Sequence, residues 1–357
     1  MPGACYHELN NKTAAAAIKK LWHATHSKNA TFKEVMMNRA VSSSVKGSPI
    51  AIRTTARSKL LKHMMERWQL YVMVLPALLF IILFAYKPMY GILIAFKNFS
   101  MRKGIMGSDW VGLDNFIRLF NSYWFPIIIK NTLSISLLSL FVGFPAPIIL
   151  ALMVNEIKSE KIKRTFQTVS YAPHFISTVV MCGMITLFLS PTSGIVNKGL
   201  NAIGLSSVFF MQEAGLFKWI YVLSGIWQGV GWGAIIYFAA LSGVDKALLE
   251  AADIDGASRL QKIFYINLPV LVPTIVVLFI LQCGSLLSVG YEKVYLLQNA
   301  TNISASEVIS TYVYKVGLIN NDFSFSTATG LFNSVVNAAI LILANTLSRH
   351  IGKVGLW

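Results

Sequence analysis

The sequence predicts an all-α membrane protein with six transmembrane helices. Hydrophobic residues make up 55% of the 357 residues and charged residues only 13%, whereas soluble domains contain about 25% charged residues. The mean hydropathy is +0.59. Six long stretches also contain no Asp, Glu, Lys or Arg. These observations exclude a disordered chain and disfavour an ordinary soluble enzyme.

Each uncharged stretch is close to the roughly 20 residues that a helix needs to cross a bilayer. Soluble proteins also contain uncharged buried helices, but six of this length in one chain favour membrane spans. In order, the predicted spans are residues 69–86, 131–154, 170–190, 219–241, 268–287 and 326–347.

The residues before the first span form a basic segment. Residues 1–67 carry twelve Lys or Arg and only three Glu, and they lack an apolar core of the length found in secretion signals. The stretch around residues 60–65 fits either a basic amphipathic helix on the membrane surface or a poorly ordered tail. We therefore predict a partly disordered cytoplasmic extension at residues 1–58 and a membrane domain at residues 59–357.

The distribution of Lys and Arg predicts the orientation, because cytoplasmic segments are enriched in them. With the N-terminus inside, 21 of the 31 basic residues lie on the cytoplasmic side and 10 on the outer side. Both termini are then cytoplasmic, and residues 87–130, 191–218 and 288–325 form long outer loops. This asymmetry also explains the net charge of +16, so we expect contact with membrane lipid and no nucleic-acid partner.

The chain lacks the residue patterns of several chemistries. It has no G-x-x-x-x-G-K-[ST] phosphate loop, and its cysteines (Cys5, Cys182, Cys283) are too scattered for a zinc site or a disulfide framework. The spans contain no acidic residue of the kind that couples transport to ions, and Glu292 lies just beyond the fifth. We expect no catalytic residue, metal or cofactor in this chain.

The inner loop at residues 242–268 carries the most informative pattern. It reads as a short helix, a glycine break and a second helix. Asp245 is placed to cap the first helix, Gly256 permits a sharp turn, and Pro269 suits the first turn of the next span. A helix–turn–helix on a cytoplasmic loop favours a docking surface for another protein, and the alternative is a merely amphipathic loop.

This loop resembles the signature loop of permease subunits of binding-protein-dependent ABC importers. The motif residues are Glu250, Ala251, Ala252, Gly256, Ile266, Leu268 and Pro269. Asp255 completes the form E-A-A-x-x-D-G-A, which is similar to the carbohydrate-uptake, maltose-transporter-like branch. The stretches WVGLDNF at residues 110–116 and SEVISTYVY at 306–314, and the closing Leu356-Trp357, resemble permeases for complex oligosaccharides. The resemblance covers about residues 60–357 and leaves residues 1–58 outside the family pattern.

The resemblance implies a type I ABC importer permease in the bacterial cytoplasmic membrane. Its partners would be a second homologous permease, two ATPase subunits that bind ATP and Mg, and an extracytoplasmic solute-binding protein that delivers a sugar. The loop from Glu250 to Pro269 would seat in a cleft of one ATPase, and ATP-driven closure would move the spans between inward-open and outward-open states.

The resemblance also implies sugar contacts. In the maltose-type family, the helix before the loop supplies a glycine and an aromatic residue, which correspond to Gly229 and Trp232 here. Gly225 shares their helix face because the three positions follow i, i+4, i+7. The alternative role for Trp232 is packing against lipid or other helices.

The helix after the loop departs from the family pattern. The family's polar positions correspond to Gln282, Leu286 and Val289, so only Gln282 is polar. Ser285 shares a face with Gln282, and we include both in the predicted pathway. A hydrogen bond between helices is the alternative role for Gln282, because a polar group facing lipid is costly.

The alternative function is that of a stand-alone secondary carrier or channel for a small polar solute. The signature loop and the lack of acidic residues in the spans argue against it.

Overall fold

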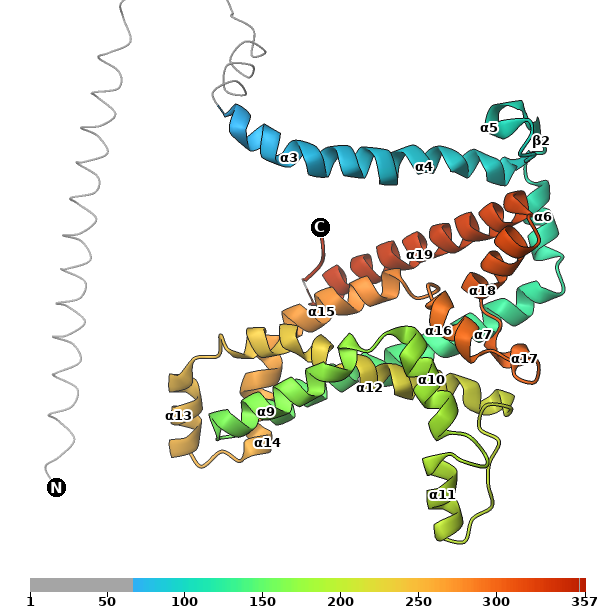
Figure 1. Cartoon of the computed structure of the whole chain (residues 1–357). Helices are drawn as coiled ribbons and strands as arrows, with labels where there is room; N and C mark the ends of the chain where they lie inside the picture. Colours follow the sequence, from blue (N-terminus) through green and yellow to red (C-terminus); the bar gives the residue numbers. More distant parts are fainter. Residues whose placement is uncertain (1–66, 353) are drawn as a thin grey trace, which may run out of the picture. The chain divides into compact units, whose positions relative to one another are not determined.

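The computed structural model describes residues 67–352 and 354–357. The extension predicted at residues 1–58 and the stretch around residues 60–65 lie outside the described residues. The chain divides into two compact units, and the second begins at Ile82. Elements carry the labels of Figure 1.

The helix of the first unit is α3, Trp68–Ile81. It is apolar on all sides, and every one of its residues is exposed, as expected for a helix whose solvent is lipid. The helical stretch Trp68–Phe96 has a mean hydropathy of 2.2 and is long enough to cross a membrane. This stretch contains the first predicted span.

The second unit begins with short elements. They are η1 (Ile82–Tyr86), α4 (Lys87–Met89), η2 (Tyr90–Phe96), β1 (Lys97–Asn98), α5 (Gly104–Gly107), β2 (Asp109–Trp110) and α6 (Asp114–Phe120). The two strands pair antiparallel, with Lys97 opposite Trp110. The Asn115 Nδ2 atom donates to the Ala95 carbonyl oxygen at 2.9 Å, which ties α6 to η2.

Helices make up the rest of the second unit. They are α7 (Trp124–Leu138), η3 (Ser139–Gly143), α8 (Pro145–Asn155), α9 (Glu160–Tyr171), η4 (Ala172–Phe175), α10 (Thr178–Phe188), α11 (Ile195–Ala202), α12 (Ala214–Leu241), α13 (Lys246–Ile254), α14 (Arg259–Lys262), η5 (Ile263–Asn267), α15 (Leu268–Gly284), α16 (Tyr291–Leu297), α17 (Ile303–Ser306), α18 (Ile309–Tyr314), η6 (Lys315–Ile319) and α19 (Phe323–Gly352).

Five helical stretches in the described chain are long and apolar enough to cross a membrane, and a bent helix pair supplies a sixth candidate. The five stretches are Trp68–Phe96, Trp124–Asn155, Ala214–Leu241, Arg259–Gly284 and Phe323–His350. They contain five of the six predicted spans, except that the fifth span ends at Gly284 rather than at residue 287. The all-α membrane fold is confirmed.

The third predicted span, residues 170–190, is not one straight helix. The stretches Glu160–Phe175 and Thr178–Phe188 meet at an angle of 98°. Pro173 lies in η4 and lacks the N–H needed to continue a helix. Ser177 has an extended backbone, and its side chain accepts a hydrogen bond from the Val180 N–H to start α10. The lack of charge predicted membrane depth but did not predict this break.

Helix α12 lies at the centre of the packing in the second unit. It packs against α8, and both helices contribute to an apolar cluster that includes Ala151, Ala234 and Leu271 of α15. Gly231 allows the close approach of α9, because a Cβ there would overlap the Ser170 backbone carbonyl. Helices α15 and α19 also lie side by side.

Candidate functional site

The first half of the inner loop forms α13, as the sequence predicts. The Asp245 Oδ1 atom accepts a hydrogen bond from the Ala247 N–H at 2.9 Å and caps the helix. Glu250, Ala251 and Ala252 occupy its middle, and the Glu250 side chain is exposed. The acidic residue of the signature is therefore available to a partner.

The turn after α13 explains the spacing of the signature residues. Asp255 is the C-cap, and the Ala257 N–H donates to the Ala252 carbonyl at 2.9 Å while the Gly256 N–H donates to the Asp253 carbonyl at 3.2 Å. This pair of bonds is the Schellman motif, which requires a left-handed residue just after the helix C-cap. Gly256 supplies it with φ 74°, so the expected glycine turn is confirmed.

The second helix of the loop, α14, is held against the first. Ser258 and Gln261 form a capping box at its start. The Lys262 Nζ atom lies 2.6 Å from Asp253 Oδ1, which joins the two helices by an ion pair. The helix–turn–helix is thus a braced unit that can transmit a movement to the next span.

The last signature residues connect the loop to α15. Ile266 lies in η5, Leu268 begins α15, and Pro269 occupies its first turn, where a missing N–H costs no hydrogen bond. Asn267 is buried, and its Nδ2 atom donates to Glu156 Oε1 at 3.3 Å. The loop is therefore anchored both to its own span and to the residue that follows α8.

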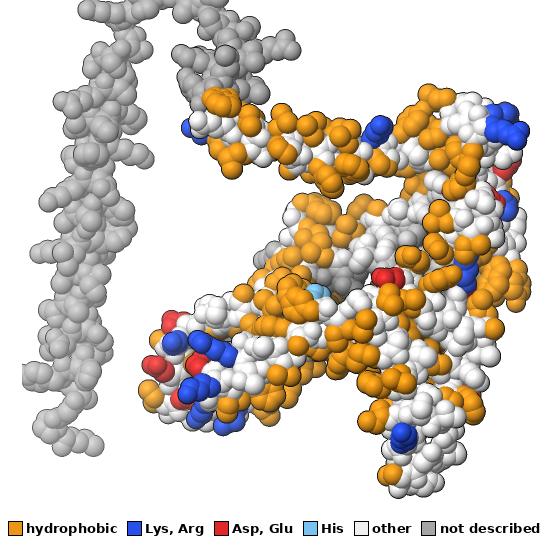
Figure 2. All heavy atoms as spheres, in the orientation of Figure 1, with side chains coloured by type: hydrophobic (Ala, Val, Ile, Leu, Met, Phe, Trp, Pro, Cys, Tyr) orange, Lys and Arg blue, Asp and Glu red, His pale blue; other side chains and the backbone are white. Residues whose placement is uncertain are grey.

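The loop presents apolar side chains beside a shallow hollow. Charged side chains gather at the end of the second unit that holds this loop (Figure 2). The hollow has a volume of about 310 Å³ and is lined by residues that include Ala252, Gly256 and Ile266. Five large apolar side chains of the loop are exposed: Leu248, Ile254, Leu260, Phe264 and Tyr265. Exposed apolar groups with a polar rim are typical of protein-binding surfaces.

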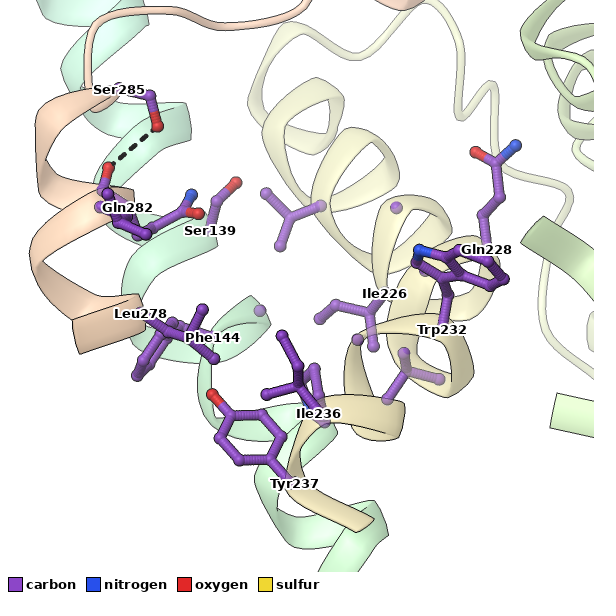
Figure 3. A pocket seen from close by; sticks show the side chains of 18 of the residues that line it. Ser139, Phe144, Ile226, Gln228, Trp232, Ile236, Tyr237, Leu278, Gln282 and Ser285 are labelled. Carbon is purple, nitrogen blue, oxygen red and sulfur yellow. Dashed lines mark hydrogen bonds between the residues drawn. The ribbon is translucent and has the colours of Figure 1, made fainter. Parts of the chain in front are cut away.

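The predicted pathway residues line one cavity of about 950 Å³. Figure 3 shows Trp232 on α12 forming one side of the cavity. Gln282 on α15 and Ser285 just after this helix lie opposite, with Ser139 of η3 beside Gln282. Gly225 and Gly229 line the same cavity, and a Cβ at Gly229 would meet only open space. The structure thus brings together all four residues that the sequence assigned to the pathway.

The Trp232 ring is fixed by its neighbours. It stacks on His174 with ring centroids 4.4 Å apart and planes 3° apart, and Phe175 meets it edge to face. The side chain is still 47% exposed. Trp232 therefore holds a set orientation and keeps indole surface free for contact with a bound molecule.

The polar side of the cavity is formed by Gln282 and Ser285. The Gln282 side chain is exposed to the cavity and makes no hydrogen bond with any described residue, and Ser285 Oγ donates to the Gln282 carbonyl at 3.2 Å. The interhelical hydrogen bond considered for Gln282 is thus absent from the described part of the chain. Leu286 and Val289 do not line the cavity.

Lys293 and Tyr221 also line this cavity, and the sequence did not point to either residue. Lys293 follows α15 in a segment that hydropathy assigned only to an outer loop. A single lysine in a loop carries no periodic signal, so only the tertiary fold places it here. Gln228 was also missed, and its Nε2 atom donates to the Ile176 carbonyl at 2.8 Å, which holds the break before α10 against α12.

Comparison with known proteins identifies relatives along most of the chain. Residues 143–353 match the family described as binding-protein-dependent transport system inner membrane component. The polygalacturonan/rhamnogalacturonan transport system permease protein YteP of Bacillus subtilis is 41% identical over 86% of this chain and 96% of its own length. Protein LplB of the same organism is 39% identical over 82% of this chain and 92% of its own length.

A solved structure has the same fold. It is a bacterial ABC transporter involved in the import of the acidic polysaccharide alginate, and one of its chains is 44% identical with a TM-score of 0.77. The match covers 82% of this chain and 99% of that chain. A second structure of an alginate transporter, in complex with a pentasaccharide-bound periplasmic protein, gives 43% identity and the same TM-score of 0.77, and covers 84% of this chain and 100% of that chain. The chain therefore belongs to the family of binding-protein-dependent transport system inner membrane components, as a permease subunit of an ABC importer with the type I fold rather than an enzyme.

Proposed function

We propose that this permease imports an oligosaccharide, which an extracytoplasmic binding protein delivers. The cavity beside Trp232 carries this proposal. It combines a fixed indole face with an amide and a hydroxyl on the facing wall, and sugars are bound by such a combination of flat aromatic surface and hydrogen-bonding groups. The carbohydrate polymers named for YteP and for the solved alginate transporter support the same class of substrate.

A second homologous permease would complete the wall of this pathway, and two ATPase subunits would bind ATP and Mg on the cytoplasmic face. The helix–turn–helix around Gly256 suits contact with one ATPase, because the loop exposes five large apolar side chains, of which Tyr265 lines the hollow. Closure of the ATPases would move the braced loop, and the continuous helix from Arg259 to Gly284 would carry the movement to the cavity.

Uptake by the reconstituted complex tests this function. Proteoliposomes with both permeases, the ATPases and the binding protein should accumulate a labelled oligosaccharide only when ATP is supplied on the side of the ATPases. The matching oligosaccharide is found first by screening the binding protein against a glycan panel. Uptake by the purified chain without ATPase subunits would support the stand-alone carrier instead.

We predict that both termini are cytoplasmic, from the excess of Lys and Arg on that side. Ser159 and Ser206 are exposed on segments that this topology places on opposite sides. A membrane-impermeant thiol reagent added to intact cells should label Ser206→Cys well above the background of the parent chain, and Ser159→Cys only after permeabilisation. Equal labelling of the two variants in intact cells would contradict this topology.

We also predict that the basic extension is dispensable for transport itself. It lies outside the family pattern and shows no sustained apolar period before residue 58. Deletion of residues 2–50 should preserve assembly and oligosaccharide uptake per complex, although expression can fall. Normal assembly with loss of uptake would instead assign the extension a role in gating or regulation.

A further inference from the structure

Lys293 is the only charged residue that lines the cavity in the described part of the chain. It lies on α16 and is half-buried. Its Nζ atom donates to the Tyr221 carbonyl oxygen at 2.8 Å and lies 4.6 Å from the centre of the Tyr221 ring. The cation is therefore held at the cavity wall by α12.

No carboxylate pairs with this cation among the described residues. The neighbouring Glu292 makes no ion pair there, whereas the other half-buried lysine of this region, Lys315, is paired with Glu307. An ammonium group has three donors, and within residues 67–352 and 354–357 Lys293 Nζ makes one hydrogen bond, to the Tyr221 carbonyl. Burial lowers the pKa of Lys293 to about 8, which leaves the side chain mostly protonated at neutral pH. A half-buried cation without a counter-ion is a costly arrangement unless an anion reaches it.

Two glycines of α12 shape the space around this cation: Gly225 lets the ammonium group approach the helix closely, and a Cβ at Gly229 would meet only open space. Gly225 lies opposite Lys293, and a Cβ at this position would lie 3.3 Å from the Nζ atom. Gly225, Gly229 and Trp232 share the cavity-facing side of α12. A ring stacked on Trp232 would thus lie in the same cavity as the ammonium group, with no side chain at Gly225 or Gly229 to intervene.

We propose that Lys293 binds a carboxylate of the transported oligosaccharide, so that the substrate class is an acidic, uronate-containing oligosaccharide. This inference rests on the proposed function and names its substrate. The ammonium group would exchange bulk solvent for a charge-assisted hydrogen bond to the sugar carboxylate, while the indole of Trp232 binds a ring face. A neutral sugar would leave the cation without a counter-ion, so the same residue would select against it.

The test uses the complete reconstituted transporter with its binding protein. The probes are trigalacturonate, which has a carboxylate on every ring, and arabinotriose, which has none. Lys293→Met removes the charge and keeps the length of the side chain, and Lys293→Arg retains the charge. Lys218→Met is the matched control, because Lys218 is an exposed lysine on α12 that does not line the cavity.

We expect Lys293→Met to lower trigalacturonate uptake per assembled complex by about tenfold or more, the loss typical of a charge-assisted hydrogen bond. Lys293→Arg should lose less, and Lys218→Met should match the parent. Parental uptake by Lys293→Met, or uptake of arabinotriose alone by the parent, would overturn the inference and leave the proposed function standing. Uptake of neither probe, by a complex whose ATPase responds to its binding protein, would instead refute the proposed substrate class.

Assembly of the variants provides a further control. If Lys293→Met does not assemble, Lys293→Gln serves as a second uncharged variant for the same uptake comparison. If both uncharged variants fail to assemble and Lys293→Arg assembles normally, the role of Lys293 is structural and the inference is wrong.

Discussion

Gly256→Val should abolish coupled transport while the permease still folds and inserts in the membrane. Gly256 has φ 74° in the Schellman turn between α13 and α14. A β-branched residue in this left-handed conformation is strained by about 1–3 kcal/mol. The turn would relax by changing its backbone angles, which would reorient α14 and the exposed apolar groups that we propose contact the ATPase. We expect at least a tenfold loss of the ATP hydrolysis that the binding protein and sugar stimulate, as an order-of-magnitude estimate from this strain.

A matched glycine separates coupling from general strain. Gly204 has φ 83° and lies on the segment after α11, and a Cβ added there would meet only open space, as it would at Gly256. Gly204→Val should therefore carry similar backbone strain and retain stimulated hydrolysis. Gly256→Asn should recover part of the activity, because asparagine tolerates the left-handed region better than valine. Unchanged transport and stimulation in Gly256→Val would show that the loop is not the coupling element.

The sequence predicted those parts of the molecule that depend on local chemistry. Uncharged runs located the spans because a bilayer excludes charge over a fixed length. Asp245 and Gly256 were identified because a helix cap and a left-handed turn each restrict the residue type at one position. The face shared by Gly229 and Trp232 followed from helical periodicity, and the cavity does contain both residues.

The remaining features depend on contacts between distant segments. The bend at Pro173 and Ser177 is stabilised by a hydrogen bond from Gln228 of α12 to the Ile176 carbonyl. No local sequence pattern predicts that bond. Lys293 lies at the cavity because its side chain contacts Tyr221 of α12. The stacking of His174 on Trp232 emerges from the same bend. Hydropathy predicts which segments lie in the membrane, but it does not predict which side chains contact one another.

We expect Trp232→Ala to reduce oligosaccharide uptake by about two- to tenfold, which corresponds to the loss of one aromatic contact of roughly 0.5–1.5 kcal/mol. The indole is fixed by His174 yet 47% exposed, so it can stack on the C–H face of a pyranose and donate from its N–H. Trp232→Phe should lose less because it keeps an aromatic face. Basal ATP hydrolysis should survive, since the helix–turn–helix around Gly256 is untouched.

Trp227 provides the matched control for this substitution. It lies on the same helix with a similar exposure of 48%, but it does not line the cavity. Trp227→Ala should therefore keep uptake per assembled complex at the parental level. If Trp232 served only in packing, its truncation would instead lower the stability of the complex by about 3–5 kcal/mol, and the amount of complex would fall together with total uptake. Uptake per assembled complex separates these roles, because a parental value in Trp232→Ala would exclude a stacking role even if less complex forms.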